Sequence, residues 1–171
     1  MQRELDEYSL WLELPHQEYG VIRKIITEIA QEIKTPVFEP HITLLGGIPQ
    51  NPTEIMAGMR QLAETQAFPL TLANFSLGEN RYRCLIAECE RTEVLMNFNT
   101  EAQELFGMKE GYRPHLSLMY GDATLETKVK LRDRLSQTKI LPLCFAVGVL
   151  SLWHIKGAAN KWKKISEVSL S

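Results

Sequence analysis

The sequence has few cysteines, no long apolar run and little net charge. Its three cysteines, Cys84, Cys89 and Cys144, lack the paired spacing of zinc ligands. We therefore expect reduced thiols that are buried as small apolar side chains. No apolar run approaches the length of a membrane span, and the charged first seven residues lack the apolar core of a signal peptide. These absences predict a cytoplasmic protein without a membrane partner.

The near-neutral charge limits the ligands that the protein can bind. The formal net charge is -2 at pH 7, which argues against sequence-independent binding of long DNA or RNA, because that binding needs a broad basic surface. A small phosphorylated ligand stays compatible with this charge. The composition is otherwise ordinary for a folded soluble protein, with 44% apolar and 23% charged residues in a chain of 171. We expect a monomer with its own core.

Apolar spacing and turn residues predict alternating strands and helices. The predicted helices span 18–33, 52–66, 92–106 and 124–137. The predicted strands span 8–14, 41–45, 68–77, 83–88, 115–120, 141–155 and 161–170. The second half of the chain repeats the order of the first half without its leading strand. This repetition indicates an internal duplication, which predicts a single domain, residues 1–171, made of two similar lobes. Because hairpins dominate, we expect an α+β fold with antiparallel sheets rather than a doubly wound parallel sheet.

Two short segments repeat one pattern around a histidine. Pro40–Leu44 is PHITL and Pro114–Leu118 is PHLSL, and together they contain two of the four histidines in the chain. From the frequencies of proline and hydroxyl residues, a chance match at one histidine has odds on the order of 1 in 1000. The duplicated pattern therefore points to a shared functional site.

Strand geometry predicts which residues of each motif face that site. Alternate residues of a strand share a face, so His41 and Thr43 lie on one side of their strand. His115 and Ser117 lie on one side of theirs in the same way, while the apolar residues between them enter the core. Two such strands would present two imidazoles and two hydroxyls to one groove.

This set of groups suits hydrolysis of a phosphodiester. In-line displacement at phosphorus needs a base beside the attacking water and an acid beside the departing oxygen. Imidazole titrates near neutrality and can serve in either role, while hydroxyls can donate to the phosphoryl oxygens as charge builds. A cyclic phosphate is an apt substrate, because its departing oxygen stays tethered. The chemistry requires no metal and no cofactor, so we expect none.

The two motifs resemble the paired motifs of the 2H phosphoesterase superfamily. The flanking segments 8–11, 38–43 and 114–122 resemble the cyclic phosphodiesterases of the plant and yeast type. That resemblance implies a bilobal fold in which two antiparallel sheets line a central cleft and helices lie outside. It also implies the substrates, which are small cyclic nucleotides. ADP-ribose 1″,2″-cyclic phosphate, a by-product of tRNA splicing, would open to ADP-ribose 1″-phosphate, and nucleoside 2′,3′-cyclic phosphates would open to 2′-phosphates.

The resemblance also implies residue roles. His115 would activate the water and His41 would protonate the departing oxygen, although the motifs alone are too symmetric to assign base and acid. The implied substrate-binding residues are Thr43, Ser117, Tyr120 and Trp11. Tyr120 is five residues after His115, so it reaches the cleft only if the strand ends or bulges before Gly121.

Other interpretations of the same residues stay open at this point. An RNA 2′,3′-cyclic phosphodiesterase or 2′-5′ RNA ligase-like enzyme would share the motifs, but it would favour a basic groove. A non-catalytic nucleotide- or RNA-binding module could keep the fold, although intact motifs speak against it. Trp11 lies on a polar strand face, where it could stack on a base. Arg81, Arg83 and Arg113 could attract a phosphate.

Overall fold

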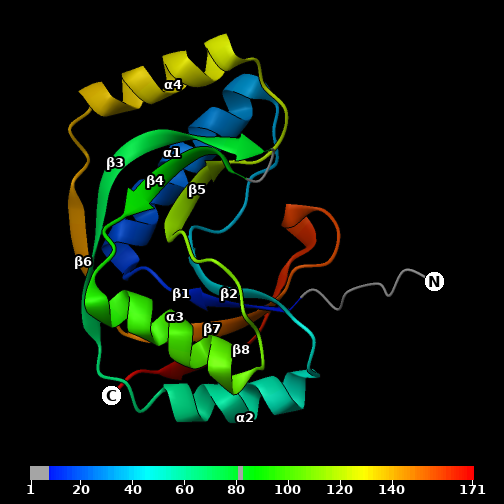
Figure 1. Cartoon of the computed structure of the whole chain (residues 1–171). Coiled ribbons are helices and arrows are strands. Elements are labelled where there is room, and N and C mark those ends of the chain that lie inside the picture. Colours follow the sequence, from blue (N-terminus) through cyan, green and yellow to red (C-terminus); the bar gives the residue numbers. More distant parts are fainter. Residues whose placement is uncertain (1–7, 81–82) are drawn as a thin grey trace.

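In the computed structural model, which describes residues 8–80 and 83–171, the strands form one strongly curled sheet (Figure 1). The strands are β1 (Tyr8–Leu12), β2 (Ile42–Ile48), β3 (Phe68–Asn80), β4 (Arg83–Cys89), β5 (His115–Met119), β6 (Leu143–Val147), β7 (Val149–His154) and β8 (Lys163–Ser169). Within the described ranges, every pairing between neighbouring strands is antiparallel. The predicted α+β class with antiparallel pairing is confirmed.

The strands form one sheet, where the sequence analysis expects two. The order is β6-β3-β4-β5-β2-β1-β7-β8. The two halves of the sheet meet between β5 and β2, where the register has one pair, Ile42 opposite Leu116. This narrow junction still joins the two halves into one curled sheet. Each half of the sheet takes strands from both halves of the sequence.

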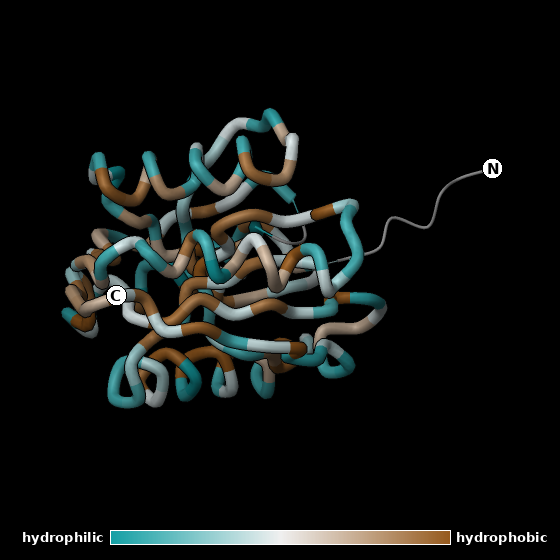
Figure 2. The backbone as a smooth tube through the Cα atoms, turned by 90° about the horizontal axis from the view of Figure 1, so that it is seen from below, coloured by the Kyte–Doolittle hydropathy of each residue, from teal (hydrophilic) through white to brown (hydrophobic). Residues whose placement is uncertain are grey.

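Helices cover the outer side of the curled sheet (Figure 1). They are α1 (His16–Ile33), α2 (Pro52–Leu62), α3 (Glu93–Leu105) and α4 (Leu125–Gln137), with a short 3-10 turn at Ala159–Lys161. Helices α1 and α4 pack on the half of the sheet from β6 to β5, while α2 and α3 pack on the half from β2 to β8. Figure 2 shows hydrophobic segments concentrated in the strands and on the inward faces of the helices. None of the helices described is long and apolar enough to cross a membrane.

Local sequence explains where three of the helices begin. The side chain of Asn51 accepts a hydrogen bond from the Glu54 backbone N–H, and the Glu54 carboxylate accepts one from the Asn51 N–H, which completes a capping box before Pro52. Thr92 and Thr124 cap α3 and α4 in the same position. These caps occupy backbone donors that a helix leaves unpaired, so the predicted starts at 52, 92 and 124 lie within one residue of the observed ones.

The predicted strand at 141–155 is wrong, because the chain forms two strands there. β6 pairs with β3 at one edge of the sheet, whereas β7 pairs with β1 and β8 near the other. The chain leaves one half of the sheet and enters the other at Gly148, whose carbonyl accepts a hydrogen bond from the Leu170 N–H. A continuous apolar run carries no information about a change of partner strand, so periodicity alone misses the break.

The prediction that all three thiols are buried is also partly wrong. Cys84 and Cys89 are buried, but Cys144 is exposed. It lies on β6, an edge strand on which Phe145 and Val147 are buried while Cys144 and Ala146 alternate with them and are exposed. The position of Cys144 in the alternation of β6, and not its small apolar side chain, therefore determines its exposure.

Candidate active site

The histidine motifs meet at the junction of the two sheet halves. The register of β2 and β5 pairs Ile42 with Leu116, and both side chains are fully buried. In an antiparallel pair, this register sets His41 across from Ser117 and Thr43 across from His115. Each imidazole thus lies beside the hydroxyl of the other motif. The junction of the sheet and the centre of the site are the same feature.

A cavity of about 180 Å³ lies over this junction, and we call it the reaction cavity. It is lined by His41, Thr43, Arg83, His115, Ser117 and Tyr120. The predicted convergence of the two motifs is therefore found in the structure. Tyr120 reaches the cavity because β5 ends at Met119, so the alternation of the strand does not govern the next residue.

Both imidazoles are held in the same tautomer. The Nδ1 atom of His41 lies 2.7 Å from the carbonyl oxygen of Glu39, and that of His115 lies 2.7 Å from the carbonyl oxygen of Arg113. A carbonyl can only accept, so each Nδ1 carries the proton and donates it. The remaining nitrogen, Nε2, is then the atom of each ring that can take or give a proton.

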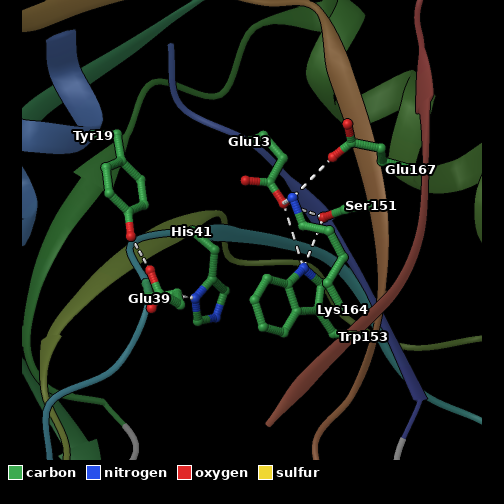
Figure 3. Close-up of polar contacts among 8 residues, drawn as sticks. All are labelled: Glu13, Tyr19, Glu39, His41, Ser151, Trp153, Lys164 and Glu167. Carbon is green, nitrogen blue, oxygen red and sulfur yellow. Dashed lines mark hydrogen bonds and ion pairs between the residues drawn. The ribbon is translucent and has the colours of Figure 1, made fainter. Parts of the chain in front are cut away.

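Side chains anchor the two segments that supply these carbonyls. The Glu39 carboxylate accepts a hydrogen bond from the Tyr19 hydroxyl, and Arg23 donates to the Phe38 carbonyl at 2.6 Å. Figure 3 shows the Tyr19–Glu39–His41 arrangement. On the other strand, Arg113 donates to the carboxylate of Glu88. The orientation of each ring is thus fixed through its neighbour two residues before it.

Burial lowers the pKa of both histidines. Desolvation disfavours the imidazolium of His41 and, with the charge of His115 adding to it, lowers its pKa from 6.5 to about 4. Desolvation likewise lowers the pKa of His115, and the guanidinium groups of Arg83 and Arg113 lower it further, while the hydrogen bond to the Arg113 carbonyl and the charge of Glu88 partly offset this shift. Both rings are therefore neutral in the free protein at pH 7.

The buried His41 should make folding sensitive to acid. In the unfolded chain its imidazole binds a proton below about 6.5, whereas the folded protein resists that proton until the pH nears about 4. Stability conferred by the neutral ring is thus lost as the pH falls through this window, by about 2 kcal/mol between pH 7.5 and 5. In urea unfolding at both pH values, His41→Gln should lose about 2 kcal/mol less than the wild type on acidification.

The matched control for this measurement is His16→Gln, because His16 is exposed at the start of α1. That variant should lose stability on acidification as the wild type does. An acid-induced loss in His41→Gln equal to that of the wild type would show that the ring is not held neutral by burial.

The ring of His41 begins an aromatic column that crosses three strands. Trp11 lies against it, with ring centroids 3.5 Å apart and an interplanar angle of 7°. Trp153 stacks on Trp11 at 4.2 Å and 20°, and the Lys164 Nζ atom lies 5.7 Å from the Trp153 ring centre. Since β1 lies between β2 and β7, the two neighbours cover opposite faces of the Trp11 ring. Stacking of Trp11 on a substrate base, one interpretation of the sequence, is therefore incompatible with the structure.

Charged groups hold the far end of the column (Figure 3). Lys164 makes ion pairs with Glu13 at 3.2 Å and with Glu167 at 2.9 Å. The Glu13 carboxylate also accepts a hydrogen bond from the Ser151 hydroxyl, and the Trp153 indole N–H donates to that hydroxyl oxygen at 2.9 Å. These contacts restrict the position of Trp153 and, through Trp11, that of His41.

Several residues of the site are found by the structure rather than by the motifs. Arg83 lines the reaction cavity, although its sequence neighbours do not distinguish it from other basic residues. Arg113 serves mainly through its carbonyl and its ion pair with Glu88. Arg81 lies outside the described residues. Trp153 and Trp162 carry no pattern that would mark them in advance, because they come from the last two strands and their connection.

No cluster of three or more His, Cys, Asp or Glu side chains that could hold a metal ion occurs in residues 8–80 and 83–171. The polar groups that line the reaction cavity are two imidazoles, two hydroxyls, one phenol and one guanidinium. Burial raises the pKa of Tyr120 above its ordinary value, so its phenol keeps its proton and can donate. Together, these groups can move protons at, and donate hydrogen bonds to, a bound phosphodiester.

Comparison with known proteins gives the same class of enzyme as the fold and the site. The family model described as "Cyclic phosphodiesterase-like protein" matches residues 7–170. The cyclic phosphodiesterase of Arabidopsis thaliana is 25% identical over 133 residues, which cover 75% of this chain and 73% of the plant protein.

Solved structures share the fold across nearly the whole chain. LigT of E. coli, solved with ATP, superposes with a TM-score of 0.64 at 17% identity, covering 97% of this chain and 98% of LigT. The protein TT0787 of Thermus thermophilus gives a TM-score of 0.64 at 15% identity, covering 96% of this chain and 97% of that one. The fold is that of the 2H phosphoesterases.

The chain therefore belongs to the cyclic phosphodiesterase-like family of 2H phosphoesterases, and it is a phosphodiesterase enzyme. Intact histidine motifs in one cavity agree with this assignment.

Proposed function

We propose that this enzyme hydrolyses cyclic phosphodiesters of small nucleotides by general acid and base catalysis with His115 and His41. Its substrates would be nucleoside 2′,3′-cyclic phosphates, opened to 2′-phosphates, and ADP-ribose 1″,2″-cyclic phosphate, opened to ADP-ribose 1″-phosphate. The observation that carries the proposal is that two imidazoles with fixed tautomers line one cavity of about 180 Å³. A phosphate group fits such a space, with a proton-transfer nitrogen available from each strand.

His115 is the proposed base. The positive charges of Arg83 and Arg113 add to desolvation in disfavouring its protonated form. These charges help the ring to stay neutral when an anionic substrate arrives, and a neutral Nε2 can remove a proton from water. The water oxygen then forms a bond to phosphorus as its proton moves to His115.

His41 is the proposed acid. A bound phosphodiester carries a negative charge that offsets the desolvation penalty of the imidazolium. The face of Trp11 against the ring favours the cation as well, since the π-face of an indole attracts positive charge. The protonated Nε2 gives its proton to the departing oxygen as the bond from phosphorus to that oxygen breaks. For a 2′,3′-cyclic phosphate the 3′ oxygen departs, which leaves a 2′-phosphate.

The remaining groups of the cavity would bind the phosphoryl oxygens. Thr43 and Ser117 bring hydroxyls from the two motifs, and Tyr120 brings a phenol that shares a hydrogen bond with Ser117. Arg83 adds a positive charge at the rim. Donors that are already in place where negative charge grows stabilise the transition state more than the ground state.

A comparison of substrates tests the proposal. Purified enzyme in EDTA should open both 2′,3′-cyclic AMP and ADP-ribose 1″,2″-cyclic phosphate, with higher kcat/KM than for an oligonucleotide that ends in a 2′,3′-cyclic phosphate. The physical reason is the small cavity and the formal net charge of -2, which give a long polyanion little to bind. Product analysis would identify the phosphate isomer.

Three outcomes of this comparison would contradict the proposal in distinct ways. A strong preference for the oligonucleotide would favour an RNA 2′,3′-cyclic phosphodiesterase or 2′-5′ RNA ligase-like enzyme. Complete loss of turnover in EDTA would reject the metal-independent mechanism. Failure to open any cyclic phosphate would reject the substrate class.

A further inference from the structure

A second and larger cavity lies next to the reaction cavity, and we call it the aromatic cavity. Its volume is about 640 Å³, and its lining includes Trp11, His41, Thr43, Tyr120, Gly157 and Trp162. Three of these residues, His41, Thr43 and Tyr120, also line the reaction cavity. The two cavities therefore adjoin at these residues, and a group attached to a bound phosphate can extend from the reaction cavity toward the aromatic cavity.

Trp162 forms the outer wall of the aromatic cavity. It follows the 3-10 turn Ala159–Lys161 on the connection between β7 and β8, and it is half-buried. Its indole N–H donates to the Gly157 carbonyl at 3.2 Å, which fixes the ring relative to the connection. A ring held by its edge in this way leaves its flat surface for other contacts.

The aromatic neighbours of Trp162 meet it at steep angles. The interplanar angles are 67° to Trp11, 73° to His41 and 62° to Tyr120. Within the part of the chain that the structure describes, no ring lies parallel to Trp162. Trp11 differs, because His41 and Trp153 cover its two faces. Of these two indoles in the aromatic cavity, only Trp162 can offer a face to a planar ligand.

We infer that Trp162 stacks on the nucleobase of the substrate and sets the preference of the enzyme for nucleotides over simple cyclic phosphates. This inference rests on the proposed function, because it places the phosphate between His41 and His115. The aromatic cavity is large enough for a base and its ribose, and the rings of Tyr120 and Trp162 are part of its lining. A base stacked on an aromatic side chain gains affinity irrespective of its identity, since every base has a π-face.

The test compares a substrate that has a base with one that lacks it. For the wild type, KM for 2′,3′-cyclic AMP should lie below KM for glycerol 1,2-cyclic phosphate by about tenfold or more. Trp162→Leu should raise KM for cyclic AMP by about tenfold with little change in kcat, and it should leave kcat/KM for the glycerol substrate within about twofold. Trp162→Phe keeps a flat ring and should retain most of the affinity for cyclic AMP.

The outcomes separate this inference from the proposed function. Equal KM values for the two substrates in the wild type would overturn the role of Trp162 without any variant. Equal losses on both substrates in Trp162→Leu would mean that the indole only supports the structure. If Trp162→Leu does not fold, loss of cyclic AMP affinity in Trp162→Phe to the level of the glycerol substrate would overturn the inference. If the wild type opens neither substrate, the proposed function itself fails.

Discussion

Replacement of either His115 or His41 by alanine is expected to lower kcat for 2′,3′-cyclic AMP by about 10²- to 10⁴-fold. Each ring offers one nitrogen, Nε2, for proton transfer, because the other donates to a backbone carbonyl. Without the ring of His115 the attacking water keeps its proton, and without that of His41 the departing oxygen leaves as an anion. Steady-state kinetics at pH 7 on the three proteins measures both effects.

The matched control is His154→Ala, since His154 lies at the end of β7 against the ring of Tyr8 and lines neither cavity. Its kcat should stay within about twofold of the wild type. The kcat of the double variant His41→Ala/His115→Ala should be little lower than that of the more impaired single variant, because groups that act as one unit give non-additive losses. A single variant with near-normal turnover would reject the two-histidine scheme.

Much of the fold follows from local patterns in the sequence. The helix predicted at 18–33 is found at His16–Ile33, where the isoleucines at 22, 25, 26 and 29 are buried at helical spacing. The alternation of the two motifs also predicts their orientation, with Ile42 and Leu116 in the core. These features depend on neighbours within a few residues, which is why the sequence alone suffices for them.

Features that depend on distant partners are not predictable in the same way. The split of 141–155 at Gly148 depends on the choice of β3 by one strand and of β1 by the next. The junction of the two sheet halves at Ile42 and Leu116 likewise depends on strands that are far apart in the sequence. Periodicity says that a segment is a strand, but not which strand it pairs with.

In the candidate site, too, local features are predictable from the sequence and features that depend on distant partners are not. The motifs single out both histidines and both hydroxyls, and the structure brings these four side chains to one cavity. The environment of Trp11 was not predictable, because its two covering rings come from the segment that enters β2 and from β7. Trp162 was missed for a related reason, since only the folded connection between β7 and β8 brings it to the aromatic cavity.

The second large effect concerns the leaving group. Protonation of the departing atom by His41 matters only when that atom is a poor leaving group. A cyclic phosphorothiolate with sulfur in place of the departing oxygen releases a thiolate, which needs no proton from the enzyme. With this substrate we expect the deficit of His41→Ala to shrink from about 10²-fold or more to within about threefold of the wild type. The deficit of His115→Ala should stay, because the water must still be activated.

The unequal surroundings of the two rings are the reason to expect this split. His115 lies near the charges of Arg83 and Arg113, which favour its neutral form, while His41 lies against the face of Trp11. These different neighbours are why we propose His115 as the base and His41 as the acid.

The most direct test of the account is kcat for the oxygen and sulfur substrates in the wild type, His41→Ala and His115→Ala, measured in EDTA. Sulfur should restore turnover in His41→Ala and leave His115→Ala impaired. Restoration in His115→Ala instead would reverse the two roles, and restoration in neither variant would contradict proton donation to the leaving group as the function of either histidine.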